Sequence, residues 1–274
     1  MYTEFYGFKE MPFSMTPNPQ FFFESAKHVE ALNTLKYVIE QRKGFVVITG
    51  DIGAGKTTIC RTLLNQLEEE VITALITHTH ILSGKDLLYT ILEDLEVDFI
   101  PGSKARLLSQ LNLFLIEQMR NNRNVVLVID EAQNLTTSVL EEIRMLSNLE
   151  TEDEKLIQII FMGQPELRKK LAQSSLEQLR QRVALFFQLT PLDAEDTTRY
   201  VQHRLKIAGA SQDQQIFTEE ARELVYQFSK GVPRLINQIC DSALLSGYVY
   251  GTKLIDKSLM EEVIHESPIT QIMK

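Results

Sequence analysis

Apolar runs that lack polar alternation recur along the first two thirds of the chain, and segments with apolar residues at helical spacing separate them. The runs have the length and composition of strands, and they are 45–48, 71–76, 125–129, 156–161 and 183–189. A strand that is apolar at successive positions is buried on both faces, as in a parallel sheet covered by helices. The helix candidates among them are 58–67, 85–95, 103–121, 136–149, 166–172 and 176–181. This alternation predicts an α/β fold with a doubly wound parallel sheet.

The pattern changes from Pro191 onward, where helical spacing continues and no further strand candidate follows. The helices predicted there are 194–208, 218–229, 233–250 and 257–265. We therefore place a domain boundary near Thr190–Leu192. The sequence predicts an α/β domain over 44–190 and a small all-helical lid domain over 191–274.

Residues 2–23 are rich in both aromatic residues and prolines, and an amphipathic helix capped by Ser25 follows them up to about Gly44. The prolines exclude a long helix, and the segment is too apolar for a free tail. We expect an extended arm, with residues 1–43 as a whole packed on the α/β domain. An arm that binds a partner protein is the alternative.

The composition is that of a soluble globular protein, since 44% of the 274 residues are hydrophobic and 24% are charged. A formal net charge of −9 argues against a wholly basic, nucleic-acid-binding surface, although it leaves room for a local basic stripe. Cys60 and Cys240 have no metal-ligand spacing and indicate a reducing compartment. No apolar run has the length of a membrane span, and the N-terminus lacks the layout of a signal peptide. We expect a cytoplasmic protein that reaches the inner membrane, if at all, through a partner.

The first strand candidate runs into GDIGAGKTT, which matches the G-x-x-x-x-G-K-[ST] pattern of a phosphate-binding P-loop. Glycines let backbone N–H groups approach the phosphates, and the helix that follows points its positive end at the same anion. Lys56 is expected to reach the β- and γ-phosphates, and the Thr57 hydroxyl to ligate Mg²⁺. The pattern predicts an ATP/ADP site built from Gly50, Asp51, Ile52, Gly53, Ala54, Gly55, Lys56, Thr57 and Thr58.

Asp130 and Glu131 directly follow the third strand candidate. A site that hydrolyses a nucleotide needs one carboxylate to hold Mg²⁺ and another to orient and deprotonate the attacking water. We assign Asp130 to the metal and Glu131 to the water. Gln164 follows the next strand candidate, and its amide faces the γ-phosphate if that strand lies between the P-loop strand and the Asp130 strand. A simple turn residue before Pro165 is the alternative for Gln164.

Three arginines are further candidates. Arg180 and Arg182 precede the last strand candidate, and each is either a surface charge or an arginine finger that reaches a neighbouring subunit. Arg234 lies in the first turn of a predicted helix, where the helix dipole disfavours a cation, so a bound phosphate is a fitting partner. The five histidines form no zinc pattern, so the sequence supports no metal other than Mg²⁺.

Together, the P-loop, the Asp130–Glu131 pair, Gln164, the two arginines and GVPR before a helix resemble an AAA+ ATPase. The similarity narrows with FYGFKEMPFSMTPNPQFFF, RKGFVVITGDIGAGKTT, VIDEAQNL, FMGQPELRKKL and LRQRV, which resemble the ExeA/GspA group of bacterial secretion and pilus-assembly ATPases and its MshM-like relatives. The resemblance covers about residues 2–265. It implies an ATPase that forms a nucleotide-dependent homo-oligomer, such as a ring, and directs assembly of an envelope complex. It also implies Gln164 as sensor 1, Arg234 as sensor 2, and Arg182 as the arginine finger with Arg180 second.

Two departures from this group change what we expect. ExeA continues into a membrane span and a peptidoglycan-binding domain that this sequence does not contain, so direct anchoring in the envelope is not expected. His78 stands where such relatives often carry an Asn that restrains the catalytic glutamate, so we expect regulation to differ. Two other functions stay open: an AAA+ regulator of DNA transposition that binds duplex DNA, and a nucleotide-gated scaffold with negligible turnover, which the presence of Glu131 disfavours.

Overall fold

The computed structural model describes residues 2–16, 18–67, 70–77, 81, 83–152, 154–211 and 213–267. The chain forms two compact units. The sheet unit contains Val29–Gly50 and Ile59–Leu189, and the helical unit contains Met1–His28, Asp51–Thr58 and Thr190–Lys274. His78 lies outside the described residues, so its expected effect on regulation stays a prediction.

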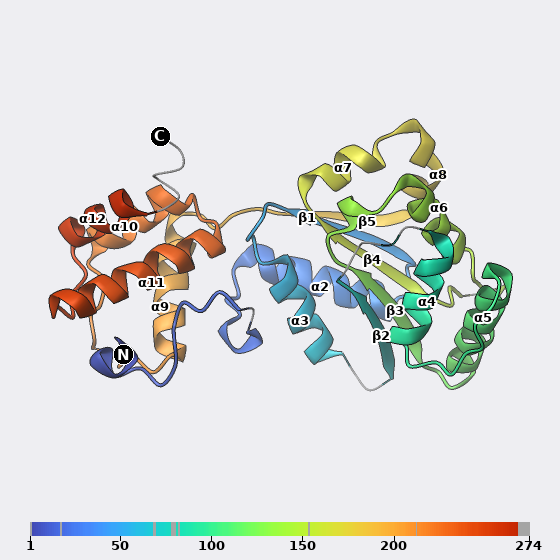
Figure 1. Cartoon of the computed structure of the whole chain (residues 1–274), viewed down its shortest axis with the longest axis horizontal. Coiled ribbons are helices and arrows are strands. Elements are labelled where there is room, and N and C mark those ends of the chain that lie inside the picture. Colours follow the sequence, from blue (N-terminus) through green and yellow to red (C-terminus); the bar gives the residue numbers. More distant parts are fainter. Residues whose placement is uncertain are drawn as a thin grey trace. The chain divides into compact units, whose positions relative to one another are not determined.

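The sheet unit is built on five parallel strands in the order β2-β3-β4-β1-β5 (Figure 1). They are β1 (Phe45–Gly50), β2 (Val71–Ile76), β3 (Asn124–Ile129), β4 (Gln158–Gly163) and β5 (Val183–Leu189). All five apolar runs are strands, which confirms the α/β prediction. β4 begins two residues later than predicted because its ladder with β3 starts at Gln158, opposite Val126, while Leu156 and Ile157 are buried ahead of it.

Helices cover the sheet, and the helical spacing of the sequence accounts for their buried faces. They are α2 (Ala26–Glu40), α3 (Lys56–Gln66), α4 (Gly84–Asp94), α5 (Lys104–Arg120), α6 (Thr137–Leu146), α7 (Pro165–Leu171) and α8 (Glu177–Gln181). Figure 1 shows α2 and α3 on one side of the sheet and α4 and α5 on the other. Leucines and isoleucines of α4, α5 and α6 join alternate residues of the strands in one core. The hydroxyls of Ser83, Ser103 and Thr136 cap α4, α5 and α6.

The strand register brings three carboxyl ends to the same edge of the sheet. Thr49 of β1 pairs with Gly163 of β4, and Ile129 of β3 pairs with Phe161 of β4. In an open α/β sheet, ligands bind outside the carboxyl ends of the strands. The segments that leave β1, β4 and β3 at this edge are therefore the place to look for chemistry.

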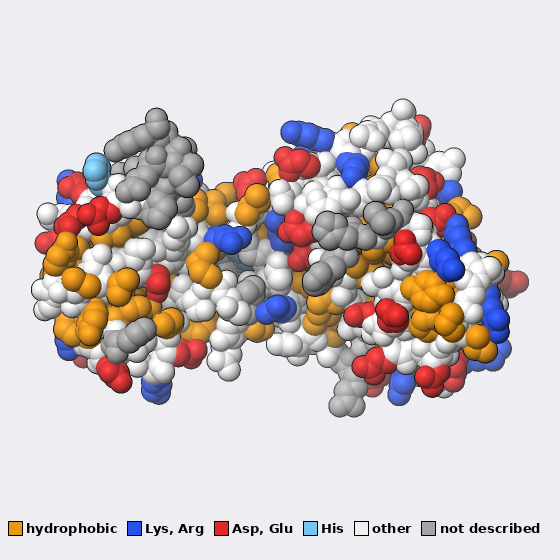
Figure 2. Space-filling model, viewed as in Figure 1, with side chains coloured by type: hydrophobic (Ala, Val, Ile, Leu, Met, Phe, Trp, Pro, Cys, Tyr) orange, Lys and Arg blue, Asp and Glu red, His pale blue; other side chains and the backbone are white. Residues whose placement is uncertain are grey.

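The helical unit contains the four predicted C-terminal helices: α9 (Ala194–Ile207), α10 (Glu219–Ser229), α11 (Pro233–Tyr250) and α12 (Lys257–Glu266). Their bounds agree with the sequence prediction to within one residue. Each has an apolar face in a single core that includes Val201, Val225, Ile239 and Met260. On the face that Figure 2 shows, basic and acidic side chains are interspersed.

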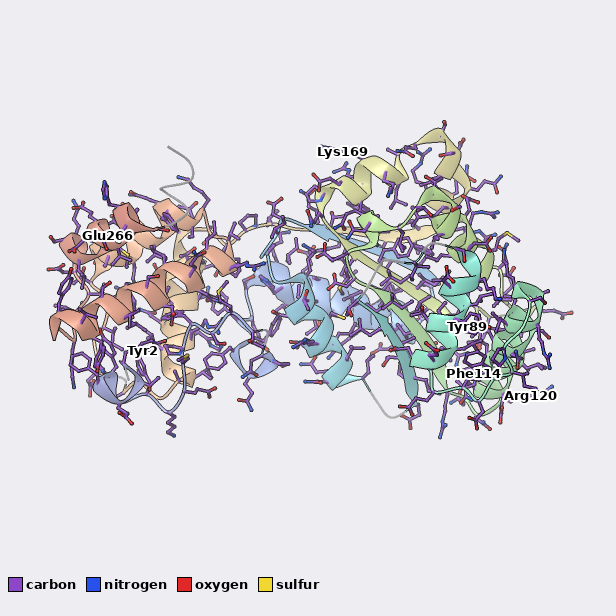
Figure 3. The ribbon with its side chains drawn as sticks, in the orientation of Figure 1. Tyr2, Tyr89, Phe114, Arg120, Lys169 and Glu266 are labelled. Carbon is purple, nitrogen blue, oxygen red and sulfur yellow. The ribbon has the colours of Figure 1, made fainter. Side chains whose placement is uncertain are left out.

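The aromatic arm belongs to the helical unit, whereas the sequence analysis expected it on the α/β domain. It contains two short helices, α1 (Tyr2–Tyr6) and the 3₁₀ turn η1 (Pro19–Phe21), so it is not extended throughout. Its buried aromatic side chains complete the core of the helical bundle, and they are Tyr2, Tyr6, Phe8, Phe13 and Phe21 (Figure 3 labels Tyr2). Small domains bury a smaller share of their apolar surface than large ones do, and the arm enlarges the core of this four-helix unit.

A buried arginine ties the arm to α9. The Nε of Arg204 donates a hydrogen bond to the carbonyl oxygen of Pro12 at 2.5 Å, and its guanidinium stacks 4.7 Å from the centre of the Phe21 ring. Nη1 donates to the hydroxyl of Tyr200 at 2.8 Å. A buried charge needs partners of this kind because desolvation is costly. Pro12 and Phe21 are thereby fixed to the helical unit.

Candidate functional site

The P-loop, residues 51–58, has a conformation that requires its glycines. Gly53 and Gly55 have φ values of +80° and +98°, which side-chain-bearing residues rarely adopt. A Cβ on Gly53 would lie 2.5 Å from the Cβ of Arg234, and one on Gly55 would lie 2.9 Å from Nε2 of His28. Each glycine is therefore required for two reasons: its backbone has a positive φ, and a neighbouring side chain occupies the space that a Cβ would need.

Lys56 and the two threonines after it open helix α3. The Nζ of Lys56 is largely buried and donates to the carbonyl oxygen of Asp51 at 3.0 Å, across the loop. The first turn of α3 carries no acidic residue, so no carboxylate of that turn competes with an anion for the positive end of the helix dipole. Thr57 and Thr58 are half-buried in this turn. A phosphate held by such a loop meets one ammonium group and a helix N-terminus.

Arg234 lies next to the P-loop within the helical unit. Its backbone N–H donates to the carbonyl oxygen of Gly53 at 3.3 Å, while its side chain is exposed. The GVPR turn depends on Gly231, where a Cβ would lie 1.7 Å from the carbonyl oxygen of Leu192. The sequence analysis expected the exposed guanidinium of Arg234 to contact a bound phosphate.

His28 is a neighbour of the P-loop that the sequence reasoning missed. Its Nε2 lies 3.2 Å from the carbonyl oxygen of Ala54, and its Nδ1 lies 2.6 Å from the hydroxyl of Ser25. The carbonyl can only accept, so Nε2 carries the proton and Nδ1 accepts from Ser25. Burial lowers the pKa of His28, which keeps the ring neutral. The one signal in the sequence was a polar pair, Ser25 and His28, at the start of an otherwise amphipathic helix.

Asp130 is buried directly after β3. Its backbone N–H extends the ladder to the carbonyl oxygen of Ile76 at 2.9 Å, and its Oδ1 accepts the backbone N–H of Glu131 at 2.9 Å. Cys60 of α3 has a pKa raised to about 12 by burial, and the negative charge of Asp130 contributes to that shift. The second turn of α3 and the Asp130 carboxylate are therefore close enough to interact.

Glu131 has an unusual backbone and a tightly held side chain. Its φ of +52° is left-handed, which costs a residue with a Cβ about 1–2 kcal/mol. Its Oε2 accepts hydrogen bonds from Nε2 of Gln133 at 2.6 Å and from Nε2 of Gln164 at 3.0 Å. Strain of this kind persists only where the surroundings fix it, and it clusters at functional sites.

Gln164 lies where the sequence analysis expected it, because β4 lies between β1 and β3. Gln164 precedes Pro165 at the start of α7, yet its side chain makes no cap to that helix. The amide turns to Glu131 instead. Gln133 is the other partner of Glu131, and the sequence analysis did not single it out, since one glutamine in VIDEAQNL carries no spacing signal of its own.

The two candidate fingers differ in exposure. Arg180 is exposed, and its Nη1 donates to the carbonyl oxygen of Ala172 at 3.3 Å. Arg182 is half-buried, and its Nη1 lies 3.4 Å and 3.5 Å from the carbonyl oxygen and hydroxyl of Ser147. These are long hydrogen bonds to uncharged acceptors, which are weak compared with a contact to phosphate.

The sequence is similar to that of known proteins. A model described as an AAA domain matches residues 39–171. General secretion pathway protein A of Aeromonas hydrophila is 41% identical over 256 residues, which is 93% of this chain and 46% of that protein. This is a GspA-like chain with an AAA domain. It spans about half the length of the curated relative it matches, 46%, and the AAA domain implies nucleotide binding.

Solved structures with this fold are far more distant in sequence. The ADP form of the Aeropyrum pernix ORC2 protein is 12% identical with a TM-score of 0.72, over 94% of this chain and 73% of that one. Cdc6p from Pyrobaculum aerophilum is 18% identical with a TM-score of 0.69, over 89% of this chain and 67% of that one. The Thermotoga maritima RuvB Holliday junction branch migration motor is 16% identical with a TM-score of 0.59, over 86% of this chain and 68% of that one. These likenesses show an AAA+ α/β fold. Among the described residues, no helix is both long and apolar enough to cross a membrane.

Proposed function

We propose that this chain is an ATPase that hydrolyses ATP to ADP and phosphate with Mg²⁺, through residues 44–190. One observation carries the proposal. Three neighbouring parallel strands end at one edge of the sheet, and the P-loop, Gln164 and the Asp130–Glu131 pair follow them. A phosphate cradle, a metal-binding carboxylate and a base beside a polar amide are the parts that phosphoryl transfer to water requires.

The residues divide the chemistry as follows. The backbone of the P-loop and Lys56 hold the β- and γ-phosphates, and Arg234 adds a cation from the helical unit. Thr57 and Asp130 carry the hard oxygen donors that Mg²⁺ prefers, and they would hold the ion. The ion would supply positive charge that offsets the charge of the phosphates. Glu131 orients a water in line with the γ-phosphate and accepts its proton as the bond to the ADP oxygen breaks.

We further propose that the chain acts as a nucleotide-dependent homo-oligomer. Arg182, with Arg180 as second candidate, would supply the arginine that stabilises the transition state in a neighbouring subunit. The weak hydrogen bonds of both side chains support this, because a developing phosphate charge competes easily with a hydroxyl or carbonyl acceptor.

The biological setting that we propose is the assembly of a bacterial envelope complex, either a secretion system or a pilus. The support is the 41% identity to a general secretion pathway protein over 93% of the chain. A partner would recruit the chain from the cytoplasm to the inner membrane. Pull-down of envelope components with Glu131→Gln protein in ATP tests this, because a variant stalled before hydrolysis retains partners of the ATP state. Equal recovery with Lys56→Ala protein would contradict it.

The activity is tested with the purified chain. Wild type should release phosphate from ATP only with Mg²⁺, Lys56→Ala should not bind a fluorescent ATP analogue, and Glu131→Gln should bind it without turnover. Lys169→Ala and Glu166→Gln, two exposed positions on α7, are the matched controls and should behave as wild type (Figure 3 labels Lys169). Turnover that survives in Lys56→Ala would contradict the proposed site.

A further inference from the structure

Gln133 joins the ends of β3 and β4 through its side-chain amide. Its Nε2 donates to Oε2 of Glu131 at 2.6 Å, and its Oε1 accepts the backbone N–H of Gln164 at 3.0 Å. A carboxylate can only accept and a backbone N–H can only donate, so these two partners fix which way the amide faces. One side chain thus contacts both the glutamate and the residue whose own amide contacts that glutamate.

The fold holds Gln133 in this place from two sides. Gly163, the last residue of β4, leaves room for it, because a Cβ there would lie 2.7 Å from Oε1 of Gln133. Lys170 of α7 fixes the backbone of the 3₁₀ turn η2 (Ala132–Asn134). Its Nζ donates to the carbonyl oxygens of Gln133 and Leu135, each at 2.6 Å. The position of the amide is therefore determined by β4 and α7 as well as by its own turn.

We propose that Gln133 is a positioning residue for hydrolysis, which sets the orientation of the Glu131 carboxylate and couples it to Gln164. The proposal rests on the proposed ATPase function. Gln133 and Gln164 each donate a side-chain N–H to Oε2 of Glu131, so the two amides orient the carboxylate and leave Oε1 for water in this proposal. A base that is held in the correct orientation toward the attacking water increases turnover. ATP binding depends on the P-loop and not on the orientation of Glu131.

Two substitutions separate the contributions of the donor and acceptor halves of the Gln133 amide, and a third substitution is the control. Gln133→Met keeps the length and volume of the side chain but loses both hydrogen bonds. Gln133→Glu keeps the acceptor for the N–H of Gln164 but replaces the donor to Glu131 with a like charge. Gln173→Met, at an exposed glutamine after α7, is the control for the chemical change alone.

The first readout is the division between turnover and binding. We expect Gln133→Met to lower kcat about 10²-fold, as a misplaced catalytic group does, with the affinity for a fluorescent ATP analogue unchanged at a temperature where the variant is folded. Gln133→Glu should lose at least as much. Gln133→Met should add nothing to the loss caused by Glu131→Gln, because the group that it positions is then absent.

The second readout needs no activity. Amide-resolved hydrogen exchange on the chain without nucleotide should show that the Gln164 N–H is protected in wild type. Protection should be lost in Gln133→Met and retained in Gln133→Glu, which still offers an acceptor. Equal exchange in wild type and Gln133→Met would show that the contact does not exist in solution and would overturn the proposal.

The outcomes distinguish the two proposals. If Glu131→Gln hydrolyses ATP as fast as wild type, the proposed base is wrong and the role of Gln133 falls with it. If Glu131→Gln is inactive while Gln133→Met keeps the wild-type kcat, the ATPase assignment stands and the positioning role alone is refuted. A fall in ATP affinity that accounts for the whole loss of kcat/KM would also refute it, since Gln133 would then act on binding.

Discussion

The neutral imidazole of His28 donates a hydrogen bond to the carbonyl oxygen of Ala54 in the P-loop, at 3.2 Å. The contact fixes the peptide between Ala54 and Gly55. The ring packs so closely on Gly55 that no side chain fits there. An aromatic neighbour, Phe22, lies edge-on to the ring with the centroids 6.0 Å apart. The first turn of α2 therefore takes part in shaping the phosphate-binding loop.

This contact predicts that the stability of the helical unit depends on pH. Burial lowers the pKa of His28, against smaller opposing contributions from the Ala54 carbonyl and Asp196. Below pH ~6.5 the unfolded chain binds a proton at His28 that the folded chain does not take up. The melting temperature should therefore fall as the pH drops from 7 to 5.5, and His28→Gln should reduce that fall. The same pH dependence in the variant would contradict this account.

The glycines of the P-loop allow a controlled test of steric fit. Gly53 and Gly7 have the same φ of +80°, but only Gly53 has a neighbour, Arg234, within 4 Å of an added Cβ. Gly7→Ala should cost about 1–2 kcal/mol through its backbone alone and leave ATP binding intact. Gly53→Ala should cost more and abolish binding. Urea unfolding and binding of a fluorescent ATP analogue measure both effects, and equal behaviour of the two variants would contradict the close approach of Arg234.

The packing of the arm predicts that Phe13 contributes strongly to the stability of the helical unit. Phe13 is fully buried, with its ring edge-on to Phe217 at 6.3 Å. Removing such a ring from a core typically costs about 3–5 kcal/mol, so Phe13→Ala should lower the free energy of unfolding by that order. Met15→Ala, at an exposed position of the same arm, should cost little. A neutral Phe13→Ala would mean that the arm does not belong to the helical core.

The sequence predicted what local patterns encode and missed what tertiary contacts create. A P-loop motif has a fixed spacing, and an apolar strand that ends in Asp-Glu after such a motif makes Asp130 and Glu131 candidates without a structure. The place of Gln164 was predicted only on the condition that its strand lies between the P-loop strand and the Asp130 strand, and the structure supplies that order. His28 and Gln133 left no such pattern, because each acquires its role from a backbone group 26 or 31 residues away.

The arm shows the same limit for packing. Its composition indicated burial but not against which partner, and the sequence analysis expected the α/β domain. The missing information was that helices α9 to α12 leave a core that needs further aromatic residues, together with a buried Arg204 that needs carbonyl partners. Apolar composition predicts that a segment is buried. The shape of the available core and the pairing of its polar groups determine which part of the protein the segment packs against.

Arg182 and Arg180 predict how subunits cooperate. Arg182→Ala should lower turnover on the order of 10³-fold and leave ATP affinity unchanged, while Arg180→Ala should have a small effect. Mixing Arg182→Ala with Lys56→Ala should restore part of the activity, because each variant supplies the group that the other lacks. Light scattering of Glu131→Gln protein with ATP should show particles larger than a monomer. Full turnover by a strictly monomeric chain would contradict a finger that acts between subunits.

The central claim is that Glu131 is the base of an Mg²⁺-dependent ATPase. The most direct measurement is phosphate release by Glu131→Gln and wild type, side by side with their affinities for ATP, at a temperature where both are folded. The account predicts equal affinity and a loss of turnover in the variant, on the order of 10²–10⁴-fold for a general base. Turnover at the wild-type rate, with ATP bound equally well, would contradict it.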